Sequence, residues 1–144
     1  MDESRVEHFL NKSLEALKLD YVDLYLIHGP VGLKYINDDT LYPRENDLIL
    51  VDMATDHVKI WKAMEAQVEA GRTKAIGVSN FSVRQIERIV EIAQIQPANL
   101  QVEAHVWFQQ KALREACKKY GITFCAYAPL GSPGRGPYFE KRGM

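Results

Sequence analysis

Two hydrophobic periodicities alternate along this chain, and the alternation limits the folds open to it. Apolar residues recur with helical spacing over residues 6–17, 58–68, 82–94 and 109–120. Short apolar runs of strand length follow these segments, at residues 21–27, 74–78, 100–104 and 122–127. A single helix between successive strands predicts parallel βαβ units, with a sheet buried on both faces. The expected fold class is therefore α/β, with about four parallel βα units.

Capping signals support the expected helix boundaries. Ser82 stands three residues before Gln85, which is the spacing of a capping box. Thr55 or Asp56 is expected to cap the second helix, and glycine at 71 and 121 is expected to end the second and fourth helices. Residues 29–53 are the exception, because this long connection is rich in Asp, Asn, Tyr and Pro and carries only weak structure signals. A connection of that length in a compact α/β chain is usually functional or mobile.

Composition excludes several classes of partner. The 144 residues have a formal net charge of -1 without a basic cluster, so we expect neither nucleic acid nor an anionic membrane as partner. The apolar runs are far shorter than a membrane span, and the acidic start does not resemble a signal peptide, so a cytoplasmic location is the default. Cys117 and Cys125 have no disulfide or CxxC spacing and are expected to be small buried hydrophobic residues.

Polar residues follow the carboxyl ends of the expected strands. His28 ends the first, Ser79 and Asn80 end the second, and Gln101 lies in the third. Carboxyl ends of parallel strands meet at one edge, where ligands bind in such folds. His28 is therefore interpreted as a proton donor or hydrogen-bond donor to a reacting carbonyl, against the alternative that it only caps a strand. Ser79 and Asn80 have the alternative of a simple strand-to-helix turn.

The fourth strand adds a ring and a loop to this edge. Tyr127 offers a flat face for stacking on an aromatic ligand, although core packing is the alternative. Gln101 in an apolar strand needs a partner for its amide, which makes a ligand contact plausible. The loop over residues 130–136, with Ser132 and several free backbone amides, is suited to a phosphate, but it lacks the spacing of a P-loop or GxGxxG.

Other kinds of site fit the sequence less well. Residues 77–81 (GVSNF) lack the second glycine of a nucleophile elbow. His28, Glu103 and His105 could chelate a metal, yet no short ligand motif supports this, and we expect no metal site. His105 is expected to bond the backbone, while His8 and His57 are expected to be solvated surface residues.

Three stretches together resemble the aldo-keto reductase superfamily. They are residues 19–28 (LDYVDLYLIH), residues 64–81 ending in KAIGVSNF, and residues 126–132 (AYAPLGS). Their order and spacing agree with the family, and the resemblance covers nearly the whole chain. It implies an eight-stranded (β/α)8 barrel that transfers hydride from NADPH to an aldehyde or ketone. Residues 1–144 would then form a single, partial domain of about four βα units, with residues 29–53 as a long loop on the active-site side.

The resemblance also assigns roles to individual residues. His28 would be the active-site histidine that orients the substrate carbonyl, and Tyr127 would stack on the nicotinamide ring. The remaining cofactor contacts would be Ser79, Asn80 and Gln101 at the nicotinamide carboxamide, and Leu130 and Ser132 at the pyrophosphate. Full-length relatives are expected to be monomeric.

The chain also departs from the family pattern. The tyrosine acid of the family, with its lysine and aspartate, comes before the histidine strand, and none of Tyr21, Tyr25 or Tyr35 lies in the tyrosine motif. The basic segment for the adenosine 2'-phosphate is absent too. The sequence is therefore expected to be a truncated form of a reductase. The alternative is a noncatalytic nucleotide-binding or structural module of the same fold.

Overall fold

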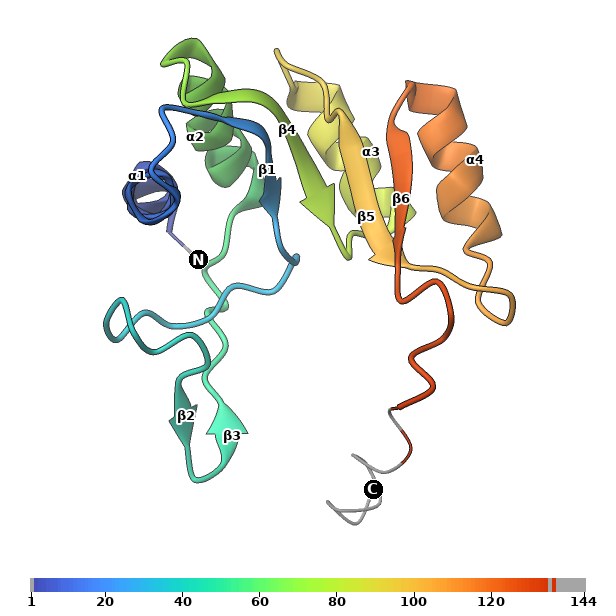
Figure 1. The fold of residues 1–144 in the computed structure, drawn as a ribbon, viewed down its shortest axis with the longest axis horizontal. Coiled ribbons are helices and arrows are strands. Elements are labelled where there is room, and N and C mark those ends of the chain that lie inside the picture. Colours follow the sequence, from blue (N-terminus) through green and yellow to red (C-terminus); the bar gives the residue numbers. More distant parts are fainter. Residues whose placement is uncertain (1, 135, 137–144) are drawn as a thin grey trace.

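The computed structural model describes residues 2–134 and 136. Figure 1 shows a curved sheet with its helices on one side and a long arm that leaves the carboxyl end of the first strand. A short 3-10 turn, η1 (Glu3–Arg5), precedes the first helix. The helices are α1 (Val6–Leu17), α2 (His57–Glu69), α3 (Val83–Ile92) and α4 (Lys111–Tyr120). The strands are β1 (Val22–Ile27), β2 (Arg44–Glu45), β3 (Leu48–Ile49), β4 (Thr73–Ser79), β5 (Asn99–Glu103) and β6 (Thr123–Tyr127).

The main sheet confirms the expected parallel βα units. Within the described residues its four strands lie in the order β1-β4-β5-β6, and every neighbouring pair is parallel. Chain order equals spatial order, because each helix returns the chain to the next position along the sheet. All four strands therefore end at the same edge, the lower one in Figure 1.

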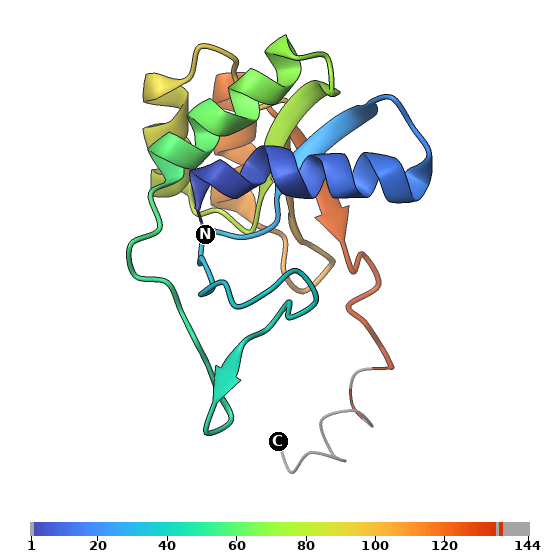
Figure 2. The same cartoon turned by 90° about the vertical axis from the view of Figure 1, so that its left-hand side faces the viewer.

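The core lies between the sheet and its helices. Ile76, Val78, Leu100 and Val102 project from the central strands into this layer, and each is buried. Trp61 of α2 is completely buried there, and its indole nitrogen donates a hydrogen bond to the Ile95 carbonyl oxygen at 3.2 Å. The side view in Figure 2 shows α1 and α2 crossing in front of the strands on this side of the sheet.

The opposite face of the sheet is buried at the central strands and exposed toward the flanks, which corrects part of the expectation of burial on both faces. Ser79 and Asn99 are 3% and 9% exposed, whereas Leu24 and Tyr127 are 39% and 38% exposed. Strand register places Leu26, Gly77 and Asn99 side by side on this face, with Gln101 and Cys125 beside one another nearer its carboxyl edge. Cys125 is only half-buried, contrary to the expected burial, whereas Cys117 is buried against the helix layer. The flanking strands expose this face because, among the described residues, no further strand pairs with their outer sides.

Short-range sequence signals are confirmed in detail. Ser82 and Gln85 form a capping box, in which each side chain bonds the other's backbone amide at the start of α3. The Asp56 side chain accepts from the Val58 amide and so caps α2. Gly121 ends α4 with a φ of 69°, in the left-handed region where glycine has no steric penalty.

The 29–53 segment, hereafter the arm, contains structure that the sequence patterns did not predict. Strands β2 and β3 form a small antiparallel hairpin, and the two residues that join them, Asn46 and Asp47, have φ values of 47° and 64°. Positive φ at both central positions is characteristic of a tight hairpin turn, and Asn and Asp tolerate it. The Asn46-Asp47 pair was therefore a local sequence signal for this hairpin turn.

A cluster of polar contacts attaches the arm to α1. His8 Nε2 donates to Asp38 at 2.7 Å, and the Tyr35 hydroxyl donates to the other oxygen of that carboxylate at 2.9 Å. Arg5 lies over the Tyr35 ring, 3.1 Å from its centroid. These two hydrogen bonds, with the His8 bond as the larger cause, lower the pKa of Asp38 to about 2.

Candidate functional site

Strand register brings the expected site residues to one edge of the sheet. Ser79 pairs with Gln101, and Gln101 pairs with Cys125 on the far side. One step nearer the edge, Glu103 pairs with Tyr127. His28 directly follows β1, whose last paired residue, Ile27, lies opposite Val78. The residues come from four different strands, yet they occupy adjacent positions at the carboxyl edge.

Asn80 connects three of these strand ends through its side chain. Its amide nitrogen donates to the His28 carbonyl oxygen at 2.9 Å and to Ser79 Oγ at 3.2 Å. Its amide oxygen accepts a hydrogen bond from the Tyr127 hydroxyl at 2.9 Å. The partners lie 52 and 47 residues away in the chain. Asn80 therefore joins the ends of β1, β4 and β6 in one hydrogen-bonded group, hereafter the Asn80 cluster.

The backbone at Asn80 is held in an unusual conformation. Its φ of 63° lies in the left-handed region, which costs most residues about 1 kcal/mol and which Asn tolerates better. Its backbone amide donates to the Gln101 carbonyl oxygen at 3.0 Å, which extends the β4–β5 ladder by one residue. The left-handed turn then directs the chain into the capped start of α3. The interpretation of Ser79 and Asn80 as a strand-to-helix turn is thus correct as far as the backbone is concerned.

Gln101 retains more capacity for a ligand than Asn80. Both amide hydrogens of Asn80 are used within the cluster, whereas among the described residues the one hydrogen-bond partner of Gln101 Nε2 is the Cys125 sulfur, at 3.9 Å. Sulfur is a weak acceptor, so this contact is easily exchanged for a better one. Gln101 is half-buried on the open face, and its neighbour Ser79 is 3% exposed.

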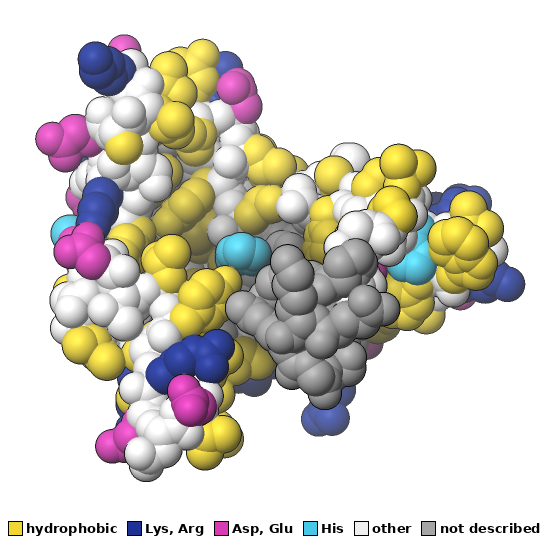
Figure 3. Space-filling view, turned by 60° about the horizontal axis from the view of Figure 1, so that its bottom comes forward, with side chains coloured by type: hydrophobic (Ala, Val, Ile, Leu, Met, Phe, Trp, Pro, Cys, Tyr) yellow, Lys and Arg dark blue, Asp and Glu magenta, His cyan; other side chains and the backbone are white. Residues whose placement is uncertain are grey.

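His28 and Tyr127 present their side chains differently. Tyr127 is 38% exposed although its hydroxyl is bound, so part of its ring remains accessible. His28 is exposed, and its carbonyl oxygen rather than its ring enters the Asn80 cluster. Figure 3 views the carboxyl edge and shows hydrophobic side chains on both sides of its centre.

The loop after β6 stands apart from the Asn80 cluster. Ala128, Gly131 and Ser132 all have positive φ, between 48° and 72°, and the Gly131 amide donates to the Ala128 carbonyl oxygen at 2.8 Å. Leu130 is 79% exposed and Ser132 is half-buried. The structure therefore places Leu130 and Ser132 at the same edge of the sheet, next along the chain from Tyr127, without a hydrogen bond to the cluster among those observed.

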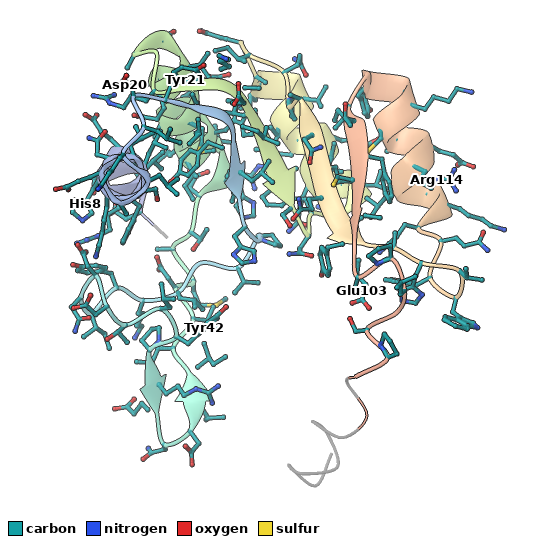
Figure 4. The ribbon with its side chains drawn as sticks, in the orientation of Figure 1. His8, Asp20, Tyr21, Tyr42, Glu103 and Arg114 are labelled. Carbon is teal, nitrogen blue, oxygen red and sulfur yellow. The ribbon has the colours of Figure 1, made fainter. Side chains whose placement is uncertain are left out.

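A glutamate and a histidine adjoin this edge, and sequence patterns gave Glu103 only as a weak metal candidate. The Glu103 carboxylate lies 3.4 Å from His105 Nε2, and Figure 4 shows Glu103 at the carboxyl end of the sheet. His105 Nδ1 is buried and has no hydrogen-bond partner among the described residues. The expected hydrogen bond from the His105 side chain to the backbone is not among those observed, because the ring contacts a carboxylate instead, while the His105 backbone pairs with that of Phe108. Alternation along β5 was the available signal, because it places Glu103 on the same face as Gln101.

The surroundings of this edge contain a groove but no cluster of metal ligands. The groove has a volume of about 300 Å³, and Asn80, Ser82, Glu103 and Tyr127 contribute to its lining. Within residues 2–134 and 136, no three His, Cys, Asp or Glu side chains are grouped closely enough to hold a metal ion. None of the described helices has the length and hydrophobicity needed to cross a membrane.

His57 corrects one expectation made from helix periodicity. Its Nε2 is 2.6 Å from the Pro30 carbonyl oxygen, and its ring packs 5.0 Å from that of Phe81. The residue is half-buried rather than solvated. Its partners come from the start of the arm and from the β4–α3 turn, which a pattern confined to its own helix does not reveal.

The parallel arc of strands and the polar carboxyl edge define a partial (β/α)8 barrel. A sequence model described as the Aldo/keto reductase family matches residues 1–141. The chain belongs to the aldo/keto reductase family.

Known relatives agree with this assignment. The chain is 47% identical over 130 residues to aldo-keto reductase family 1 member A1 of Xenopus tropicalis, which covers 90% of this chain and 39% of that protein. It is 46% identical over 134 residues to aldo-keto reductase family 4 member C11 of Arabidopsis thaliana, which covers 93% of this chain and 40% of the relative. The chain thus spans about two-fifths of the length of these relatives.

Solved structures give the same result for the fold. The aldose reductase of Schistosoma japonicum superposes with a TM-score of 0.85 at 39% identity, over 99% of this chain and 48% of that one. The aldose reductase of Giardia lamblia superposes with a TM-score of 0.82 at 33% identity, over 90% of this chain and 42% of the other. The arc of four strands described here therefore has the curvature of the corresponding part of those enzymes.

Proposed function

We propose that this chain supplies the nicotinamide-binding edge of an aldo-keto reductase, which reduces aldehydes or ketones to alcohols with NADPH. The observation that carries the proposal is the Asn80 cluster, because it fixes the ends of three strands relative to one another at the expected site. Family membership supports the oxidoreductase class. The small-molecule carbonyl substrate and the choice of NADPH are part of the proposal.

The described residues fit a nicotinamide cofactor in three respects. Gln101, whose amide nitrogen has a weak sulfur partner within the described part of the chain, and the buried Ser79 beside it are suited to hydrogen bonds with a carboxamide. The accessible ring of Tyr127 is held by its hydroxyl, which keeps its face available for stacking. The loop that carries Leu130 and Ser132 turns through three left-handed residues, and such turns direct backbone amides toward an anion.

In the proposed reaction, the chemistry that NADPH would supply when bound is hydride for the reduction of a carbonyl carbon. The His28 imidazole would donate a hydrogen bond to the carbonyl oxygen and so orient the substrate. The Asn80 cluster would hold the strand ends at fixed separations, which preserves the alignment of cofactor and substrate. We assign the proton donor to a tyrosine outside this chain, supported by a lysine and an aspartate.

One observation favours the second candidate, a noncatalytic nucleotide-binding module. A tyrosine, a lysine and an aspartate do meet in this chain, where Lys74 Nζ donates to Asp23 at 2.8 Å and to the Tyr21 hydroxyl at 2.9 Å. The hydrogen bond to Asp23 is the larger cause of a raised pKa at Lys74, and the hydrogen bond to Tyr21 is the second. Figure 4 shows Tyr21 at the amino end of β1, opposite Glu103. This group therefore cannot protonate a substrate held at the carboxyl edge.

Two measurements distinguish the candidates. NADPH with an aromatic aldehyde is followed by absorbance, and NADPH alone is followed by protein fluorescence. Because the reductase proposal places the proton donor outside this chain, turnover is measured in a longer protein that includes the tyrosine, lysine and aspartate. Turnover there that falls in a His28→Gln variant supports the reductase, while quenching by NADPH without turnover in that longer protein supports the binding module. Absence of both responses contradicts the nicotinamide site in this chain.

Cys117 and Cys125 are both free thiols, which supports a reducing, cytosolic location as part of the same proposal.

A further inference from the structure

His57 closes the base of the arm. Its Nε2 lies 2.6 Å from the Pro30 carbonyl oxygen, and this contact joins the start of the arm to the first residue of α2. A carbonyl oxygen only accepts hydrogen bonds, so Nε2 carries the hydrogen and donates it. The backbone of the donor is itself held, because the neighbouring Asp56 caps α2 by accepting from the Val58 amide at 3.0 Å.

The His57 ring rests on the turn that carries Asn80. Its centroid lies 5.0 Å from that of Phe81, which is 1% exposed and belongs to the core. Phe81 stands between Asn80, with its left-handed backbone, and Ser82, the cap of α3. A ring packed in the core is a rigid support for the imidazole. His57 therefore has a fixed position relative to Asn80.

Two hydrogen bonds from different elements hold the backbone on either side of Gly29. The His28 carbonyl oxygen accepts from Asn80 Nδ2 at 2.9 Å, and the Pro30 carbonyl oxygen accepts from His57. Gly29 itself adds little restraint, because glycine has the widest choice of backbone conformations and a Cβ there would have no atom of the described residues within 4 Å. The Pro30 bond therefore restrains the chain on the far side of Gly29, where the Asn80 bond does not reach.

We propose that His57 is a positioning residue for His28, because its hydrogen bond to Pro30 fixes the backbone that carries the His28 ring. The action of His28 on a carbonyl substrate rests on the proposed function, whereas the restraint on its backbone does not. A displaced His28 would lose its alignment with the substrate carbonyl. The cofactor contacts would be retained, since the proposed function assigns them to β4, β5, β6 and the loop after β6.

The first test is NMR spectroscopy of the 144-residue chain. Correlation of the ring nitrogens with the ring carbon-bound hydrogens should show the His57 hydrogen on Nε2, and a ring protonated on Nδ1 alone overturns the proposal. His57→Phe keeps a ring against Phe81 and removes the donor, so it should shift the backbone signals of His28 and Gly29. Unchanged signals at both residues in the folded variant also overturn the proposal.

The second test measures turnover in a longer protein that includes the tyrosine, lysine and aspartate. We expect His57→Phe to lower kcat about fivefold, the equivalent of one net hydrogen bond, and to leave the KM for NADPH unchanged. His57→Gln keeps an N–H donor and should recover part of the lost kcat. An unchanged kcat in His57→Phe, a loss that appears as a raised KM for NADPH, or equal losses in the two variants overturns the positioning role.

His8→Phe is the matched control, because it makes the same substitution at a second histidine that contacts the arm. His8 Nε2 bonds the Asp38 carboxylate at 2.7 Å, farther along the arm from His28. This variant should keep the kcat and the His28 signals of the unchanged protein. Equal effects of the two Phe variants overturn the proposal, because they indicate a general loosening of the arm. Absence of turnover in the unchanged longer protein contradicts the proposed function instead, and the NMR signals then still test the restraint on His28.

Discussion

At the scale of single residues, Asn80 combines a backbone role with a side-chain role, and the two can be separated. Asn80→Ala removes the bonds to His28 and Tyr127 and places a less tolerant residue at a φ of 63°. We expect the free energy of unfolding to fall by about 1–3 kcal/mol, measured by urea denaturation. Asn80→Gly removes the same bonds but accepts the conformation, so it should lose about 1 kcal/mol less. Equal losses in both variants would show that the backbone conformation carries no cost.

Asp38 provides a pH prediction at the same scale. Its pKa is lowered from 3.8 to about 2 in the folded chain, so the folded state holds this proton more weakly than the unfolded state does. The stabilisation is therefore complete above about pH 4, and it is lost as pH falls toward 2. NMR titration of the carboxyl carbon should give a midpoint near 2.

The Tyr35→Phe variant is the control for this titration. It removes one of the two donors to Asp38 and should move the midpoint upward, toward 3.8. A midpoint of 3.8 in the unchanged chain would contradict the contacts that attach the arm to α1.

At the scale of elements, the close packing of β1, β4 and β5 depends on Gly77. A Cβ there would lie 2.5 Å from the Asn99 carbonyl oxygen and 2.8 Å from Leu26 Cδ2, and the first of these is backbone that cannot move aside. Gly77→Ala should lower the free energy of unfolding by about 1–3 kcal/mol or more. Gly29→Ala has open space and should stay within about 0.5 kcal/mol of the unchanged chain in the same denaturation experiment. Similar values for the two variants would show that the strands separate to admit a side chain.

Contacts within one element could be predicted from the sequence, whereas contacts between distant elements could not. The capping box of Ser82 and Gln85 was predictable because both partners lie within one helical turn. The hairpin of the arm was missed because its strands have only two residues each, too few for a period-two pattern, although the Asn46-Asp47 turn was a local signal. The prediction that His57 is a solvated surface residue was wrong, because its partner, Pro30, lies 27 residues earlier in the chain. The Asn80–Tyr127 bond was not predictable for the same reason, since it joins strand ends that only the sheet brings together.

At the scale of the whole molecule, the described residues form an arc of four parallel strands whose carboxyl ends lie at one edge. Superposition on solved aldose reductases covers 48% and 42% of their chains, and the site residues within this part lie at adjacent strand ends. The partial covering of the inner face accounts for the exposed flanks, where the expectation of burial on both faces was wrong. It also explains why polar residues such as Gln101 are only half-buried there. The hydrogen bonds of the Asn80 cluster therefore all lie within this arc.

We propose that the carboxyl edge gathers His28, the Asn80 cluster and Gln101 into one nicotinamide site. The most direct test is a titration of the isotopically labelled chain with NADPH, followed by amide and side-chain NMR shifts. We predict that the largest shifts occur at Ser79, Asn80, Gln101 and Tyr127, with the Gln101 side-chain amide moving when it exchanges its sulfur partner. Shifts confined to other surfaces, or the absence of shifts in a folded chain, would contradict the claim.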